Sequence, residues 1–280
     1  MLSLLSVLVL TITVASALPT SQSITELQHV FPVVNSPTST HPKRRPLVIW
    51  HGLGDTANSD GISGLVQDIK DMFPGIYIHT VATPAGGSVD DERRAGFYGN
   101  ASSQVDAMAA TIQDIPELQE GFDGIGFSQG GLFMRDYVQR YNVPPVSNLL
   151  TASYFRDHDR LDVFHKMNKY LTRLNGELEH QPEAARNIAG LQNLILVNFE
   201  QDQTVYPKES STFGSLTPSQ VNSSNPVIPL TDSPFLWAED RIGLRTLAEK
   251  GHLRYGTANE SCPGSHMDLQ WGEKTGGITI

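Results

Sequence analysis

The residues with the clearest chemical meaning lie at Gly126–Gly130, which reads G-F-S-Q-G and sets one serine between glycines. This is the G-x-S-x-G pattern of a nucleophile elbow, a sharp strand-to-helix turn that exposes a serine hydroxyl. We expect glycine at both ends because a side chain there would crowd the neighbouring strand and helix. The pattern therefore indicates acyl transfer with Ser128 as nucleophile. The alternative is an ordinary glycine-rich turn that exposes a serine.

A serine nucleophile needs a general base and an acid that orients it, and after such an elbow these follow in the order acid, then histidine. Asp202 comes shortly after the apolar run at 194–199, which reads as a buried strand. A carboxylate in that loop lies at the carboxyl edge of a parallel sheet, on the side of the serine. Asp232 and Asp240 compete for the role but follow no buried strand. We therefore predict Asp202 as the acid.

Two histidines follow Asp202 in the chain, His252 and His266. His266 lies in a Pro/Gly turn near the end of the sequence, which is where this architecture places its base. His252 follows the end of an expected helix, where an imidazolium is favourable as a cap. We predict His266 as the base.

The oxyanion of an acyl-transfer intermediate needs two backbone N–H donors. One should come from Gln129, the residue after the nucleophile, and the other from the loop after the first strand. That loop is His51–Asp55, which reads H-G-L-G-D, and Leu53 is the candidate donor. His51 precedes the acid in the chain, so we predict a packing role for it rather than a catalytic one.

Short apolar runs alternate along the chain with segments of helical periodicity. The expected strands are 46–50, 76–81, 122–125, 146–150 and 194–199, and the expected helices are 62–69, 105–112, 131–138, 161–178 and 241–250. This alternation predicts an α/β protein with a mostly parallel sheet covered on both faces, an α/β-hydrolase fold. Residues 210–233 are rich in Ser, Thr, Pro and Asn and are expected to form a surface loop.

The N-terminal segment and three sequons predict the secretory route. Residues 1–17 read as a signal peptide with an A-x-A cleavage site, 18–45 as a polar flexible leader, and 46–280 as a single α/β-hydrolase domain. Asn100, Asn222 and Asn259 begin glycosylation sequons. Cys262 is the single cysteine, so no disulfide can form within the chain. The net charge of -10 without a basic patch argues against nucleic acid as a partner, and no later segment predicts stable membrane insertion.

Several blocks of this sequence resemble the palmitoyl-protein thioesterase family. They are Pro46–Asp55, Phe73–Tyr77, Gly121–Gly131, Asn198–Asp202, Glu239–Leu244 and Pro263–Met267. The resemblance implies a Ser128–His266–Asp202 triad with Leu53 and Gln129 as oxyanion donors, and no metal or organic cofactor. It also implies S-acylated proteins or peptides and fatty acyl thioesters as substrates, and a location in the lysosome or vacuole or outside the cell.

The sequence departs from the family pattern at two places. After Thr151 the family would continue with a glycine-rich turn and several tens of residues containing cysteines, and this stretch is missing here. At the other end, residues 270–280 are polar and glycine-rich where the family has an apolar helix. Two alternatives to a thioesterase therefore stay open: a lipid carboxylester hydrolase, and a catalytically impaired form that binds acyl proteins or does not fold stably. The oligomeric state is not predicted.

Overall fold

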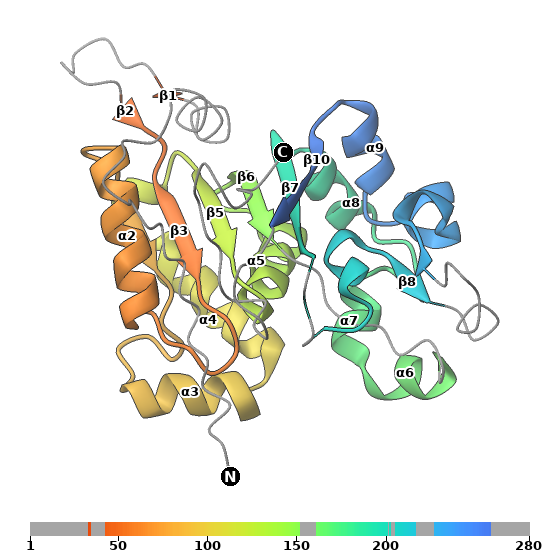
Figure 1. Ribbon diagram of the computed structural model, residues 1–280, viewed down its shortest axis with the longest axis horizontal. Helices are drawn as coiled ribbons and strands as arrows, with labels where there is room; N and C mark the ends of the chain where they lie inside the picture. Colours follow the sequence, from red (N-terminus) through yellow and green to blue (C-terminus); the bar gives the residue numbers. More distant parts are fainter. Residues whose placement is uncertain are drawn as a thin grey trace.

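The computed structural model describes residues 33–34, 43–151, 161–200, 202, 205–216 and 227–258. Its centre is a six-stranded sheet in the order β10-β7-β6-β5-β3-β4, in which every pair of neighbours is parallel (Figure 1). The strands are β3 (Leu47–Trp50), β4 (Ile78–Thr80), β5 (Phe122–Gly126), β6 (Val146–Thr151), β7 (Asn193–Phe199) and β10 (Leu253–Ala258). Short antiparallel pairs join β1 (Val33–Val34) to β2 (Lys43–Arg44) and β8 (Ser215–Leu216) to β9 (Val227–Ile228).

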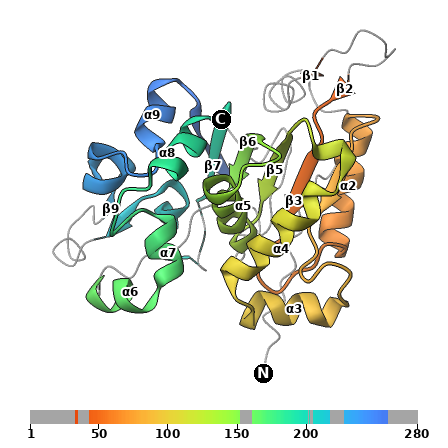
Figure 2. The ribbon, with the colours of Figure 1, turned by 180° about the vertical axis from the view of Figure 1, so that it is seen from behind.

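Helices lie on both sides of this sheet, as expected for the α/β-hydrolase fold (Figures 1 and 2). They are α2 (Asp60–Met72), α3 (Val89–Tyr98), α4 (Ala101–Gln113), α5 (Gln129–Arg140), α6 (Leu161–Met167), α7 (Lys169–Leu174), α8 (Pro182–Ala189) and α9 (Leu244–Glu249). Four shorter helical turns cover 116–118, 208–212, 230–232 and 234–238.

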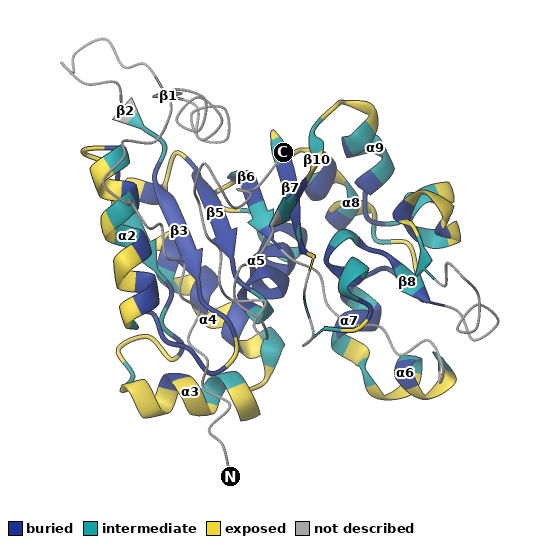
Figure 3. Cartoon of the chain, viewed as in Figure 1, coloured by how far each residue is buried: buried dark blue, intermediate teal, exposed yellow. Residues whose placement is uncertain are grey.

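The strand residues divide the core into two layers because successive side chains point to opposite faces of a sheet. Leu47 and Ile49 pack with α2, whereas Val48 and Trp50 pack with α4 and α5. Burial follows this division, with the strands and the inner helix faces buried and the outer helix faces exposed (Figure 3). The continuous apolar character of β3 therefore reflects burial on both of its faces.

The order of the strands makes the position between β3 and β5 a topological switch point. The chain runs from β3 outward to β4 and then returns to β5 on the other side of β3. Loops that leave the carboxyl ends of two strands at such a switch point diverge and leave room between them. The loop after β3 and the elbow after β5 are therefore the two segments that leave the sheet at this switch point.

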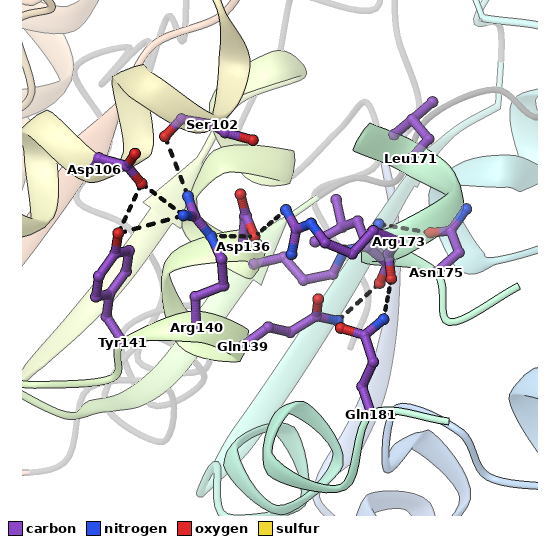
Figure 4. Close-up of polar contacts among 12 residues, drawn as sticks. Ser102, Asp106, Asp136, Gln139, Arg140, Tyr141, Leu171, Arg173, Asn175 and Gln181 are labelled. Carbon is purple, nitrogen blue, oxygen red and sulfur yellow. Dashed lines mark hydrogen bonds and ion pairs between the residues drawn. The ribbon is translucent and has the colours of Figure 1, made fainter. Parts of the chain in front are cut away.

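A polar contact region joins α5 to α7, and we call it the α5–α7 seam (Figure 4). Asp136 is fully buried, and its Oδ1 accepts from Arg140 Nε at 3.0 Å and from Arg173 Nη2 at 2.7 Å. Beside it, Arg135 donates to Asn175 Oδ1 at 2.8 Å, and burial lowers the pKa of Arg135 to about 10. The guanidinium is thus charged at neutral pH, and charged groups inside the protein link these two helices.

Several expected elements differ from the observed ones. The predicted helix at 161–178 is wrong, because it is two short helices separated at Asn168, whose side chain caps α7 by accepting from Leu171 N. Leu178, the last residue of the expected helix, lies beyond α7 and is 58% exposed. The prediction of a surface loop at 210–233 is also wrong in part, because Phe213 and Leu230 are buried in the core.

The predicted flexible leader, 18–45, contains a short antiparallel strand pair, since both β1 and β2 lie within it. The predicted signal peptide, 1–17, lies outside the described residues.

Candidate active site

Ser128 lies in the turn between β5 and α5, where a nucleophile elbow should place it. Its backbone has φ 52° and ψ -118°, and residues other than glycine rarely adopt a positive φ. Such strain persists only where the surroundings enforce it, and it is concentrated at functional sites. The serine is therefore held on a sharp turn at the N-terminus of α5.

The glycines on both sides of Ser128 lie where neighbouring backbone is too close for a side chain. A Cβ atom on Gly130 would lie 2.4 Å from the Trp50 carbonyl oxygen and 2.5 Å from that of His51. A Cβ atom on Gly126 would lie 2.4 Å from the Cα of Gly131. The prediction that these positions require glycine is confirmed, and the reason is close approach of β3, β5 and α5.

The loop after β3 approaches the same serine. A Cβ atom on Gly52 would lie only 3.3 Å from the Cβ of Ser128. Leu53 follows in this loop and is 41% exposed, whereas Gln129 is the first residue of α5. The structure therefore brings the segments of both predicted oxyanion donors next to the serine.

His51 is the first residue of this loop, and its side chain is buried. Its Nδ1 lies 2.9 Å from the carbonyl oxygen of Gly52, and its Nε2 lies 3.5 Å from the Glu92 carboxylate. Both ring nitrogens therefore face protein groups rather than the serine. This agrees with the predicted packing role of His51.

Asp202 comes three residues after the end of β7. Its N–H donates to the Phe199 carbonyl at 3.2 Å, and its Oδ1 accepts from Val205 N at 3.1 Å. The strand pairings place Gly126, Thr151 and Leu196 at the same level, so the chain leaves β5 and β7 at one edge of the sheet. Since neighbouring strands lie about 4.8 Å apart, roughly 10 Å separates the lines of β5 and β7, a gap that an intervening imidazole could bridge.

The competing acids and the second histidine have other contacts. Asp240 accepts from the backbone N–H groups of Arg245 and Thr246 and so caps the start of α9. Asp232 is exposed in a helical turn. The ring Nδ1 of His252 lies 3.2 Å from the Leu191 carbonyl oxygen, beyond the end of α8. The backbone N–H of His252 donates to the Leu247 carbonyl oxygen at 3.1 Å, so its main chain caps α9, the helix that precedes it. None of these contacts involves the serine.

The remaining predicted residues fall into two groups. Asn100 is exposed and caps α4, with its Oδ1 accepting from Ser103 N at 3.0 Å. His266, Asn222, Asn259 and Cys262 lie outside the described residues, so their positions stay predictions.

Sequence reasoning missed Glu92, a buried residue on α3. The helix itself had a readable start signal, because Ser88 and Asp91 form a capping box in which each side chain accepts from the other's backbone N–H. The burial of Glu92 had no such signal, since it follows from how α3 packs on the loop after β3.

The sheet order, the strained serine and the adjacent loop define the class of protein, an α/β-hydrolase. The family model described as palmitoyl protein thioesterase matches residues 46–153 and 147–266. The chain therefore belongs to the palmitoyl protein thioesterase family, and it is a thioesterase. The two matched segments overlap at 147–153, next to the point where the sequence departs from the family pattern.

Individual relatives agree with this assignment. Palmitoyl-protein thioesterase 1 of Caenorhabditis elegans is 30% identical over 257 residues, covering 76% of this chain and 84% of that protein. Palmitoyl-protein thioesterase 3 of Dictyostelium discoideum is 28% identical over 252 residues, covering 76% and 83%. The Lysosomal thioesterase PPT2 homolog of Drosophila melanogaster is 23% identical over 254 residues, covering 75% and 82%. Within the part of the chain that the structure describes, no helix is long and apolar enough to cross a membrane.

Proposed function

We propose that this protein hydrolyses long-chain fatty acyl thioesters, such as palmitoyl groups on cysteine residues of lipidated proteins, through an acyl-serine intermediate. The observation that supports this best is the backbone of Ser128, which is held at φ 52° next to Gly52. The names of the relatives from Caenorhabditis elegans and Dictyostelium discoideum support the palmitoyl group as the acyl chain.

In the proposed first half-reaction, His266 takes the hydroxyl proton of Ser128 as the oxygen attacks the thioester carbonyl carbon. The new C–O bond leaves negative charge on the carbonyl oxygen, and the N–H groups of Leu53 and Gln129 stabilise it. Collapse of this intermediate breaks the C–S bond, and the imidazolium of His266 returns the proton to the leaving thiolate.

In the second half-reaction, His266 removes a proton from water, whose oxygen attacks the carbonyl carbon of the acyl-serine. The bond from that carbon to Ser128 Oγ then breaks, His266 returns the proton to Oγ, and the fatty acid is released. Asp202 orients the imidazole and stabilises its charged form throughout. Each oxyanion donor is expected to contribute about 3–4 kcal/mol of barrier lowering.

A fluorophosphonate probe tests the triad on the purified protein. We expect covalent labelling of Ser128 in the wild type and none in Ser128→Ala. A folded wild-type protein that is not labelled would favour a non-catalytic acyl-protein binder. Turnover that survives in Ser128→Ala would show that another group is the nucleophile.

A second measurement separates the thioesterase from a lipid carboxylester hydrolase. Rates are compared on a palmitoyl thioester and on the oxygen ester with the same acyl chain and a matched leaving group. We expect a higher kcat/KM for the thioester. A preference for the oxygen ester would reverse the assignment of substrate class.

We also propose the secretory route for this chain, with 1–17 as signal peptide, 18–45 as leader and 46–280 as one domain. The exposed position of Asn100 supports a glycan there, and the name of the Drosophila melanogaster relative supports the lysosome. Expression in a eukaryotic host with and without glycosidase treatment tests this. A mass unchanged by the enzyme would argue against the route.

A further inference from the structure

Helix α3 has an inverted distribution of side chains. Its large apolar side chains are largely exposed, with Tyr98 87% and Phe97 56% exposed, whereas Glu92 is only 4% exposed. A helix normally buries its apolar residues, and a carboxylate is buried only where charged or hydrogen-bonding partners compensate the loss of water. Glu92 therefore has a specific role on the loop that α3 covers.

The carboxylate of Glu92 holds both ends of the loop after β3. Its Oε2 accepts from the backbone N–H of Ala57 at 2.9 Å and lies 3.5 Å from Nε2 of His51. These two residues border the segment that carries the oxyanion donor Leu53. One buried side chain thus connects the entrance and the exit of that segment.

The tautomer of His51 follows from its other contact. Its Nδ1 lies 2.9 Å from the carbonyl oxygen of Gly52, which can only accept, so Nδ1 carries a hydrogen. The contact chain from Glu92 through His51 therefore extends to the peptide group that joins Gly52 to Leu53.

The same helix also contacts the second donor segment. The side-chain amide of Gln129 donates to the carbonyl oxygen of Gly96 at 3.2 Å. The Phe97 ring lies against Gly54, where an added Cβ would come within 3.2 Å of it, and Gly54 has φ 80°. Helix α3 therefore contacts the Leu53 loop and the first residue of α5 together.

We propose that Glu92 is a positioning residue for the oxyanion donors. Through its contacts with Ala57 and His51 it fixes the Leu53 loop on α3, and α3 also holds the side chain of Gln129. This inference rests on the proposed function, because it assumes that the two backbone N–H groups bind the oxyanion. Such donors act only when they lie about 2.7–3.1 Å from the position of the oxyanion, so a loop released by a fraction of an ångström loses transition-state binding. Substrate binding itself does not need this precision.

The test is steady-state kinetics of the full chain on a palmitoyl thioester, with each rate divided by the folded fraction. We expect Glu92→Ala to lower kcat about 100-fold, the scale of losing one oxyanion donor, with KM within about threefold of wild type. Glu92→Gln should recover most of the rate, because its amide oxygen can accept from Ala57 N and its N–H can donate to His51. The matched control is Asp90→Asn on the exposed side of α3, with kcat and KM unchanged.

A role limited to stability would give a different result. If Glu92→Ala lowers the melting temperature but leaves kcat per folded molecule unchanged, or changes KM alone, the positioning role is wrong. If Glu92→Ala does not fold, Glu92→Asp is the deciding variant. Its shorter side chain should displace the loop and lower kcat. A kcat of Glu92→Asp equal to that of wild type would overturn the proposal.

Failure of the proposed function is distinguished by the probe. Wild-type protein that is not labelled at Ser128 would overturn the triad itself. Labelled wild type with kinetically normal Glu92 variants would overturn only the role of Glu92.

Discussion

Two regions of the molecule, the elbow beside β3 and β5 and the α5–α7 seam, are held together by different kinds of contact. Around β3, β5 and the start of α5, backbone approaches backbone so closely that Gly126 and Gly130 have no room for a methyl group. Across the α5–α7 seam, long charged and amide side chains such as Arg173 and Gln139 connect the elements instead (Figure 4). Where backbone packs on backbone, few rotatable bonds are free to adjust to a change. Each contact made by a long side chain instead depends on several rotatable bonds, which must be ordered when the contact forms.

This difference predicts how the elbow and the seam respond to substitutions. A change near the elbow should displace reacting groups, because nothing between the strands can adjust. A change in the seam should cost stability with little effect on the chemistry of the molecules that remain folded.

The largest effect is expected for Gly130→Ala. The added methyl group must displace the carbonyl groups of Trp50 and His51, and so both the oxyanion loop and the serine. Because misplacement of reacting groups by about 1 Å can reduce rates about 100-fold, we expect at least that loss of kcat/KM. Thioester kinetics and fluorophosphonate labelling measure it.

The matched control is Gly64→Ala in α2, where an added Cβ meets nothing within 4 Å. It should keep full activity and add about 0.5–1 kcal/mol of stability. Equal activity of the two variants would contradict the close packing of the elbow.

The next largest effect is expected for Asp136→Ala in the seam. Removing this buried carboxylate leaves Arg140 and Arg173 without their shared acceptor, so unfolding in urea should show a loss of about 3 kcal/mol. The kcat of the folded fraction should stay within about threefold of wild type. Asp162→Ala on the exposed side of α6 serves as control. If Asp136→Ala lowered kcat as much as Gly130→Ala does, the contrast between the elbow and the seam would be wrong.

A leucine pair tests the break in the expected helix at 161–178. Leu174 is fully buried, so Leu174→Ala should lower the free energy of unfolding by about 2–4 kcal/mol. Leu178 is largely exposed, and Leu178→Ala should change it by no more than about 0.5 kcal/mol. Similar losses in both variants would instead support one continuous buried stripe.

The smallest expected effect is the pH dependence of stability that comes from His79 in the edge strand β4. Burial lowers the pKa of His79 below its ordinary value of 6.5. The unfolded chain therefore binds more protons than the folded protein just below pH 6.5, so His79 makes stability fall as the pH decreases through that point and has no effect above it.

Melting temperatures of wild type and His79→Gln between pH 7.5 and pH 5 measure this contribution. The variant should show a shallower decline, while His180→Gln at an exposed position should follow wild type. An identical decline in wild type and His79→Gln would show that His79 does not contribute to the acid sensitivity.

The sequence by itself determined the class of fold, the strand that leads into the elbow, and the need for glycine at positions 126 and 130. These features are local: an apolar run followed by a tight turn restricts the backbone to few conformations. Local patterns also indicated the loop after β3 and the strand that precedes Asp202.

Only the tertiary structure decided the break at Asn168, the burial of Phe213 and the exposure of Leu178. It also decided that Glu92, an ordinary acidic residue in a polar segment, lies inside the protein against His51 and Ala57. Each of these outcomes depends on which distant segment packs on the residue, and neither periodicity nor composition records that partner.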